Sequence, residues 1–257
     1  MTKRVKYGLL GHPLGHSFSR KFHNDRFEQL GIDAVYENFD LPSVDLLPGV
    51  IQENADLRGL NVTIPYKQEV MQFLDELDPV AERIGAVNTI RIERVGEEAG
   101  PTKLPGCRLK GFNTDIIGFR DSIKPMLNDS HRHALILGTG GASKAIRVAL
   151  LDMGITPVYV SRTAAEGRLT YADLTPEVMA QYTVIVNCTP LGMFPKVDAC
   201  PDIPYHLLTP DHVLFDAVYN PEETLFMQKA AAQGAKTKCG LEMLVGQALA
   251  SYEILTR

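Results

Sequence analysis

The sequence predicts an α/β fold in which mainly parallel sheets are covered by helices. Short apolar runs of strand type alternate with amphipathic stretches of helix type, which is the order that βαβ units produce. The alternation runs in two series, and a polar, hairpin-like region over residues 85–115 lies between them. With 257 residues, of which 45% are hydrophobic, the chain has the length of one large domain or two small ones.

The first series contains strand and helix signals in turn, and each predicted helix ends near Gly or Pro. The predicted elements are a strand over 5–10, a helix over 19–31, a strand over 34–39, a helix over 44–52, a strand over 57–64 and a helix over 67–77. Two extended runs, 86–93 and 108–115, then flank the polar loop 94–107 and predict a hairpin at the edge of the first unit.

The second series begins after a predicted helix over 116–127 and the polar stretch that follows it. It predicts a strand over 134–138, a helix over 144–154, strands over 157–162, 183–188 and 213–218, and helices over 222–233 and 241–255. No internal repeat interrupts this order.

Composition favours a small molecule as the partner. The net charge of −5 is spread along the chain, so neither a nucleic-acid stripe nor a polybasic membrane patch is expected. The N-terminal apolar run ends at Leu10, too early for a signal peptide or a membrane span, and a cytoplasmic location is therefore predicted. The histidines and the four cysteines have no metal-ligand spacing, so we expect reduced thiols and no metal.

A glycine cluster opens the second series. The stretch ALILGTGGASKAIRVALL is an apolar strand, a Gly-rich turn and an amphipathic helix, the context of a dinucleotide fingerprint. Gly138 suits the tight turn, and Gly140 and Gly141 let the backbone approach a pyrophosphate at the helix N-terminus. Ser143 stands at the third glycine position, which makes the match looser; an ordinary strand-to-helix turn is the alternative.

The end of the next strand indicates which nucleotide is bound. An NAD site would carry Asp or Glu there, whereas this chain has Ser161, Arg162 and Thr163. A guanidinium and two hydroxyls suit a 2′-phosphate, so NADP is predicted. The alternative is a surface arginine that pairs with Glu166.

Polar side chains follow several predicted strands of the first series. Because ligands of parallel sheets gather outside the carboxyl ends of the strands, these side chains predict a site for a small polyhydroxylated acid. They are Ser17, Ser19, Asn61, Thr63, Lys67, Asn88, Asn113, Thr114 and Asp115.

Each of these residues also has a purely structural explanation. Ser17 and Ser19 could cap the following helix, and Asp115 could be the N-cap of the helix after it. Asn residues at strand ends often bond the backbone, and Lys67 could be a surface lysine, although lysine is unfavourable at a helix start. Gln247 lies in an apolar helix and needs a partner, either a substrate hydroxyl or a backbone group.

Eight motifs in order give the sequence a family resemblance. GHPLGHSFSRKFHN, GLNVTIPYK, GAVNT, GFNTDIIG, GTGGA, NCTPLGM, DAVYNP and GLEMLVGQA extend from Gly11 to Ala248, and the chain resembles the shikimate dehydrogenases. The resemblance implies a substrate domain over 1–115 plus 240–257 and an NADP-binding Rossmann domain over 116–239. It also implies reversible reduction of 3-dehydroshikimate to shikimate in aromatic amino-acid biosynthesis.

The resemblance further assigns roles to individual residues. Ser17 and Ser19, assisted by Tyr219, would bind the substrate carboxylate, and Lys67 and Asp115 would form the catalytic pair. The ring hydroxyls would be bound by Thr63, Lys67, Asn88, Asp115 and Gln247, with Asn61 as a supporting neighbour. The implied cofactor contacts are Gly138, Thr139, Gly140, Gly141, Ala142, Ser161, Arg162, Thr163, Thr189, Met193, Gly240 and Met243.

The chain departs from the family pattern at two places. Arg20 stands where many members have Pro, and Glu166 replaces a second basic residue after Arg162, with Arg168 as a possible substitute and a shortened crossover. A quinate/shikimate dehydrogenase that uses NAD therefore stays open. So does a non-catalytic shikimate-binding protein, although a binding protein needs no acid–base pair; a folate-type or amino-acid-type dehydrogenase would not require the serine pair. We expect a monomer or a homodimer.

Overall fold

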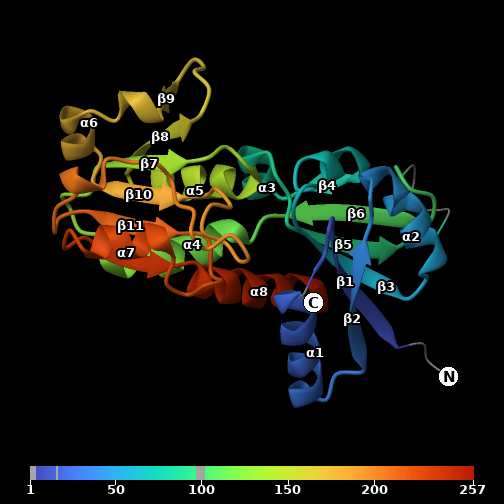
Figure 1. Cartoon of the computed structure of the whole chain (residues 1–257). Coiled ribbons are helices and arrows are strands. Elements are labelled where there is room, and N and C mark those ends of the chain that lie inside the picture. Colours follow the sequence, from blue (N-terminus) through green and yellow to red (C-terminus); the bar gives the residue numbers. More distant parts are fainter. Residues whose placement is uncertain (1–3, 16, 97–101) are drawn as a thin grey trace. The chain divides into compact units, whose positions relative to one another are not determined.

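The computed structural model describes residues 4–15, 17–96 and 102–257 (Figure 1). His16 and the middle of the predicted loop 94–107 lie outside these residues. The chain forms two compact units, Met1–Thr114 with Ala248–Arg257 (unit 1) and Asp115–Gln247 (unit 2). The first boundary falls one residue before the one expected from the sequence. The second falls within the last helix, whereas the sequence analysis placed the whole of that helix with the substrate domain.

Unit 1 is built on a six-stranded sheet with the order β2-β1-β3-β5-β6-β4. Its neighbouring strands are parallel except at β5, which is antiparallel to both β3 and β6, so the predicted hairpin is present and the sheet is mainly parallel. Its elements are β1 (Val5–Gly11), α1 (Phe18–Leu30), β2 (Ala34–Asp40), η1 (Val44–Leu46), α2 (Leu47–Glu53), β3 (Leu57–Val62), η2 (Glu69–Phe73), β4 (Glu76–Leu77), α3 (Pro79–Ile84), β5 (Thr89–Arg94) and β6 (Cys107–Phe112).

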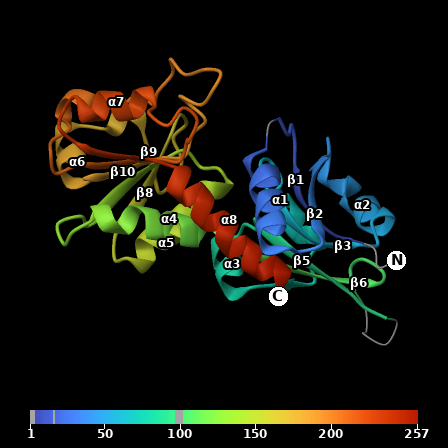
Figure 2. The same cartoon turned by 90° about the horizontal axis from the view of Figure 1, so that it is seen from below.

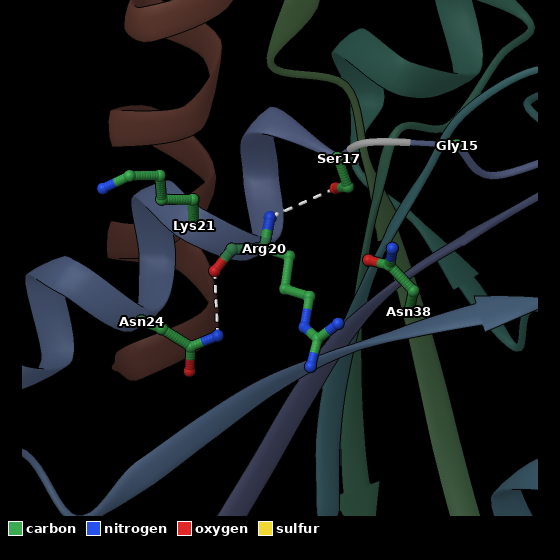
Figure 3. Close-up of a pocket in the computed structure, with 6 residues that line it drawn as sticks. All are labelled: Gly15, Ser17, Arg20, Lys21, Asn24 and Asn38. Carbon is green, nitrogen blue, oxygen red and sulfur yellow. Dashed lines mark hydrogen bonds between the residues drawn. The ribbon is translucent and has the colours of Figure 1, made fainter.

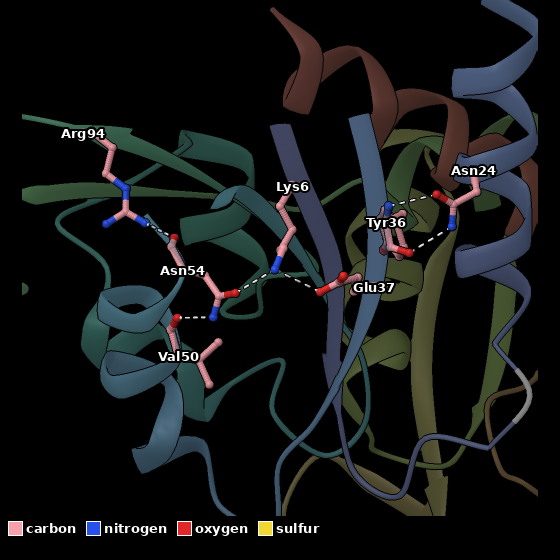
Figure 4. A network of polar contacts seen from close by, with 7 residues as sticks. All are labelled: Lys6, Asn24, Tyr36, Glu37, Val50, Asn54 and Arg94. Atoms are coloured by element: carbon pink, nitrogen blue, oxygen red, sulfur yellow. Dashed lines mark hydrogen bonds and ion pairs between the residues drawn. The ribbon is translucent and has the colours of Figure 1, made fainter. Parts of the chain in front are cut away.

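Polar side chains tie the ends of these elements to one another (Figure 4). Lys6 of β1 donates to Asn54 Oδ1 at 2.8 Å and pairs with Glu37 of β2 at 3.2 Å. The guanidinium of Arg94 donates to the Ile51 carbonyl at 2.9 Å and to that of Asn54, and so satisfies backbone acceptors at the C-terminal end of α2. These contacts connect β1 to β2, and they connect both β1 and β5 to the C-terminal end of α2.

Unit 2 has a fully parallel sheet with the order β12-β11-β10-β7-β8-β9. With β7 taken as the first strand, this is the strand order 3-2-1-4-5-6 of a Rossmann fold. The switch point of the sheet then lies between β7 and β10. Figure 2 shows α7 on one face of this sheet and α4 and α5 on the other. The elements are α4 (Asp115–Ile123), η4 (Lys124–Met126), β7 (His133–Leu137), α5 (Gly141–Asp152), β8 (Thr156–Ser161), β9 (Arg168–Thr170), η5 (Tyr171–Asp173), α6 (Pro176–Gln181), β10 (Val184–Asn187), η6 (Tyr205–Leu207), β11 (Val213–Asp216), α7 (Leu225–Ala231) and β12 (Lys236–Cys239).

The last helix, α8 (Leu241–Thr256), belongs to both units. In unit 1 its C-terminal half packs on β3, where a Cβ added to Gly59 would collide with the Leu255 side chain. In unit 2 its first turns pack on α4. Among the described residues, no helix has both the length and the apolar character that crossing a membrane requires.

One predicted helix is wrong. The sequence predicts a helix over 67–77, but the structure has a short 3-10 helix at η2 and then the strand β4. The carboxylate of Asp75 accepts hydrogen bonds from the backbone amides of Lys103 and Leu109, both at 2.7 Å. These long-range bonds draw the chain alongside β6, and they are worth more than the weak helix propensity of the segment.

Candidate active site

The first predicted site residues lie where β1 gives way to α1. Ser17 is the N-cap of α1, and its Oγ accepts a hydrogen bond from the Arg20 amide at 3.2 Å. The capping role considered from the sequence is therefore real, but it uses the hydroxyl oxygen only as an acceptor and leaves its proton for a ligand. Ser19 lies in the first turn and is half-buried. A hollow of about 420 Å³ lies beside Ser17 and is also lined by Asn24 and Asn38. Figure 3 shows how these side chains lie around it.

Asp40 fixes the loop that precedes these serines. At the end of β2, its carboxylate accepts the Leu14 amide at 2.9 Å and contacts His12 Nδ1 at 2.7 Å. The amide bond first, and the imidazole second, lower the pKa of Asp40. The carboxylate therefore stays charged at neutral pH and anchors the segment before Ser17.

Asn61 lies inside unit 1 and uses both ends of its amide. Its Oδ1 accepts from Tyr36 Oη at 2.7 Å, and its Nδ2 donates to Thr89 Oγ1 at 3.2 Å and to Ser251 Oγ. It is 6% exposed. These contacts fit the supporting role named for Asn61 better than a direct ligand role, and Tyr36 and Ser251 are partners that the sequence did not indicate.

Asn88 connects two strand ends at the same edge of the sheet. Its Nδ2 donates to Thr114 Oγ1 at 2.9 Å, and its Oδ1 accepts the Thr114 amide at 2.8 Å. Asp115 follows Thr114 directly in the chain and is the first residue of α4, so it is a first-turn acid and not the N-cap considered from the sequence. Asp115 is 4% exposed.

Thr63 and Lys67 follow β3. The Thr63 amide donates to the Leu10 carbonyl at 2.9 Å, and the Lys67 carbonyl accepts the Val87 amide at 2.7 Å. Both side chains are half-buried. Their backbones are thus fixed at the carboxyl edge of β1 and β3, as predicted from the strand-end pattern.

The Gly-rich turn of unit 2 lies at the switch point of its sheet. Gly138 has φ +99°, a left-handed conformation that favours glycine, and a Cβ there would lie 3.0 Å from the Thr189 side chain. A Cβ on Gly140, the N-cap of α5, would meet no heavy atom within 4 Å. The predicted helix starts earlier than expected, at Gly141, because Ser143 donates its hydroxyl to the Gly140 carbonyl at 2.6 Å and stabilises the first turn.

The end of β8 carries the residues predicted for the adenosine side. Ser161 donates its hydroxyl to the Thr163 carbonyl, and Arg162 and Thr163 are exposed. Among the described residues Arg162 makes no ion pair with Glu166, so the pairing considered as its alternative is absent. Arg168 begins β9, the added edge strand of the shortened crossover, opposite Tyr159.

Two further loops follow β10 and β11. Thr189 donates its amide to Asn187 Oδ1 at 3.0 Å and its hydroxyl to the same atom at 2.7 Å. Met193 is 45% exposed and Tyr219 is 38% exposed, so both side chains present surface to solvent. The buried carboxylate of Asp216 lies beneath both loops. Sequence reasoning missed this residue.

A glycine contact positions the remaining predicted residues of unit 2. A Cβ on Gly118 of α4 would lie 2.9 Å from the Gln247 nitrogen, so α4 and α8 pack at backbone distance, and this contact brings Gln247 alongside the helix that Asp115 begins. The Gln247 amide donates to the Leu244 carbonyl at 3.0 Å. Met243 is buried, and Gly240 has no room for a side chain because of the Ala217 carbonyl.

These residues fit a dinucleotide. The Rossmann strand order, the left-handed Gly138 and the open N-terminus of the twelve-residue α5 form a phosphate site without steric obstruction. The exposed Arg162 supplies a cation beside the end of β8, where a 2′-phosphate is read.

The comparisons agree with this geometry. Residues 9–90 match the family model described as the shikimate dehydrogenase substrate binding domain. An NADP(+) shikimate dehydrogenase of Desulforamulus reducens is 36% identical, in an alignment that covers 97% of this chain and 89% of that protein. The chain belongs to the shikimate dehydrogenase family.

Solved structures of this family and of its relatives share the fold. A shikimate dehydrogenase of Thermus thermophilus, in complex with NADP(H) and shikimate, is 32% identical, with a TM-score of 0.81 over 98% of this chain and 93% of the other. A quinate dehydrogenase of Corynebacterium glutamicum in complex with NAD is 27% identical, with a TM-score of 0.82 over 98% and 93%. The shikimate dehydrogenase fold thus extends over nearly the whole chain.

Proposed function

We propose that this chain is an NADP-dependent shikimate dehydrogenase that reversibly reduces 3-dehydroshikimate to shikimate in aromatic amino-acid biosynthesis. The observation that carries the proposal is the match to an NADP(+) shikimate dehydrogenase over 97% of the chain. It spans both the polar strand ends of unit 1 and the dinucleotide fold of unit 2. We assign substrate binding to unit 1 and NADP binding to unit 2.

Unit 1 supplies most of the groups for substrate. Ser17 and Ser19, at the start of α1, would donate hydrogen bonds from their hydroxyls to the carboxylate, and the charged Asp40 anchors the loop before them. Thr63 and Asn88 would bind ring hydroxyls, and Asn61 would fix the strand ends behind them. Tyr219 and Gln247, from unit 2, would complete the set.

Lys67 and Asp115 would perform the proton chemistry. When bound, NADPH supplies a hydride to the ketone carbon, and negative charge then develops on the ketone oxygen. The Lys67 ammonium would donate a proton to that oxygen, and its neutral amine would accept the proton in the oxidative direction. The Asp115 carboxylate would orient the ammonium toward that oxygen.

In unit 2, Gly138, Thr139, Gly140, Gly141 and Ala142 would surround the pyrophosphate, and Ser161, Arg162 and Thr163 the 2′-phosphate. Thr189, Met193, Gly240 and Met243 would line the nicotinamide side. Of these, Met193 offers exposed apolar surface, while Met243 is buried and would act through its backbone or through packing.

The test is the rise in reduced-nicotinamide absorbance with shikimate and NADP+. We expect turnover in the wild type and a kcat lower by ~10²–10⁴ in Lys67→Ala, the range of general acid–base catalysis. Lys124→Ala is the matched control, because Lys124 is exposed on η4, and it should retain wild-type rates. Wild-type rates in Lys67→Ala would contradict the role of the lysine.

The same assay separates the two other hypotheses. Preference for NAD+ and quinate would indicate a quinate/shikimate dehydrogenase, the alternative raised by Glu166 at the position of a second basic residue. Thermal stabilisation by shikimate without turnover with any pair would indicate a non-catalytic binding protein. The cytoplasmic location and the monomeric or homodimeric state stay predictions, to be checked by cell fractionation and light scattering.

A further inference from the structure

Asp216, at the carboxyl end of β11, is a fully buried acid to which no role has been assigned above. Its exposed fraction is 0%. Three donors surround it: Asn187 Nδ2 at 2.9 Å and the Val218 amide at 3.0 Å bind Oδ1, and Thr224 Oγ1 at 2.6 Å binds Oδ2. All three come from different segments of unit 2. We call these four residues the Asp216 network.

The Asp216 network connects the two loops that carry exposed predicted site residues. Asn187 uses its Nδ2 on Asp216, which fixes the orientation of its amide, so that its Oδ1 accepts both hydrogen bonds from Thr189. The Val218 amide precedes Tyr219 in the loop after β11. Thr224 in turn is the N-cap of α7.

The ionised carboxylate binds this arrangement of donors most strongly. Asn187 Nδ2 and the Val218 amide can only donate, so Oδ1 must accept from both, and a charged oxygen accepts hydrogen bonds roughly twice as strongly as a neutral one. A proton on Oδ2 would reverse the bond with the Thr224 hydroxyl, which can also accept, and would weaken the two bonds to Oδ1. No ion pair involves Asp216 in the described part of the chain, so its charge is stabilised by hydrogen bonds alone.

We propose that Asp216 is a positioning residue for cofactor binding: its ionised carboxylate, through Asn187 and Val218, sets the two loops that carry Thr189, Met193 and Tyr219. The inference rests on the proposed function. It adds that NADP affinity depends on the charge state of a residue that does not itself touch the cofactor.

Because the Asp216 carboxyl is buried, its charge changes at a pH close to neutrality. Burial raises the pKa of Asp216 to about 6, against the opposing hydrogen bonds from Thr224, Val218 and Asn187. Two other titratable groups face it, the Cys188 thiol and the Tyr205 phenol. Burial, as the largest cause, raises the pKa of both, so both are neutral in the range where Asp216 changes its charge.

The experiment compares the NADP+ dissociation constant of the wild type and of Asp216→Asn from pH 5 to pH 8. The amide keeps the shape but is neutral, like the protonated acid. At pH 7 we expect the variant to bind NADP+ at least tenfold more weakly. At pH 5 the two dissociation constants should differ less than threefold, because Asp216 of the wild type is then mostly protonated. The 2′-phosphate also titrates near pH 6, but it affects both proteins equally and cancels in the ratio.

Two further variants complete the design. Asp211→Asn removes an exposed acid just before the amino end of β11 and should bind like the wild type at every pH. Thr224→Val removes one bond that lowers the pKa of Asp216, and should move the inflection of the wild-type profile to higher pH; it also tests the inference if Asp216→Asn does not fold.

The outcomes separate this inference from the proposed function. Shikimate-dependent turnover in the wild type, combined with tight, wild-type-like NADP+ binding by Asp216→Asn at pH 7, would overturn the positioning role alone. A ratio of dissociation constants that does not change with pH would also overturn it, because a merely structural defect is insensitive to the charge state. Absence of turnover in the wild type would contradict the proposed function instead.

Discussion

Gly118 of α4 and Gly246 of α8 face each other at backbone distance: a Cβ on Gly246 would lie 3.1 Å from the Gly118 Cα. Gly118 leaves no space for a methyl group, and a methyl group at Gly246 would fit only if the Gly118 backbone shifted slightly. Because Asp115 lies one turn before Gly118, and Gln247 follows Gly246, this contact sets the spacing of two predicted substrate residues within unit 2.

Gly118→Ala should therefore disturb both stability and substrate binding. The new methyl group would push against the Met243 carbonyl and the Gln247 amide, and overpacking of this kind costs ~1–3 kcal/mol. We expect a lower unfolding temperature and a higher KM for shikimate. Gly49→Ala, in α2 with no atom near its Cβ, is the control and should be neutral or stabilising. Equal behaviour of the two variants would contradict the contact.

Asn61→Ala should act mainly on stability. It leaves the buried Tyr36 hydroxyl without its acceptor and removes the bond to Ser251, a loss of about 2–3 kcal/mol in the free energy of unfolding by urea titration. The KM for shikimate should change less than threefold. A tenfold rise in KM without loss of stability would instead make Asn61 a direct ligand.

Arg162→Ala should reduce the preference for NADP over NAD. A charge-assisted bond to phosphate is lost, but the guanidinium is exposed, so we expect an NADP+ dissociation constant roughly tenfold higher and unchanged NAD+ binding. Arg168→Ala is the comparison. If it has the larger effect, Arg168 and not Arg162 reads the 2′-phosphate.

His23→Phe should change how stability depends on pH. His23 is 1% exposed, stacks on Tyr36 with ring centroids 4.5 Å apart, and has an unpartnered buried Nε2. Burial, with a smaller effect of Arg26, lowers the pKa of His23 to about 4. The unfolded chain, with an ordinary pKa near 6.5, therefore binds more protons than the folded chain between about pH 4 and 6.5, and stability falls as the pH falls through that window.

The size of the expected stability loss follows from the lowered pKa of His23. On account of His23 the wild type should lose about 2 kcal/mol of unfolding free energy from pH 7 to pH 5, and the variant should not. Asp216 has a raised pKa and contributes with the opposite sign, so the difference between variant and wild type is the quantity to measure. His206→Gln, at an exposed histidine, is the control. A constant difference across this range would mean that His23 is not buried as described.

The sequence predicted what local patterns determine. Alternating apolar runs predicted both sheets, and the glycines at 138–141 predicted the dinucleotide turn, because each signal lies within a few residues. The strand-end rule placed Thr63, Lys67 and Asn88 at one edge of the unit 1 sheet. Whether the substrate residues of the two units act together stays a prediction.

What the sequence could not predict depends on distant partners. The strand β4 forms because Asp75 binds the amides of Lys103 and Leu109, and β9 has only three residues, one exposed and two half-buried, too few for an apolar pattern. In the sequence, nothing distinguishes Asp216 from any other acid at the end of a strand. Its importance emerges only when Asn187, 29 positions earlier, is seen to donate to it.

The hydrogen bond between Asn61 and Ser251 joins residues 190 positions apart, within a unit whose other residues precede position 115. During synthesis, the strands of unit 1 leave the ribosome first, but the segment that covers β3 leaves last. At ~5–20 residues per second, the ribosome needs on the order of ten seconds to make the intervening unit. Over that interval the amide of Asn61 and the face of β3 at Gly59 lack their native partners, so the nascent chain exposes a recognition surface for chaperones that the finished protein does not have.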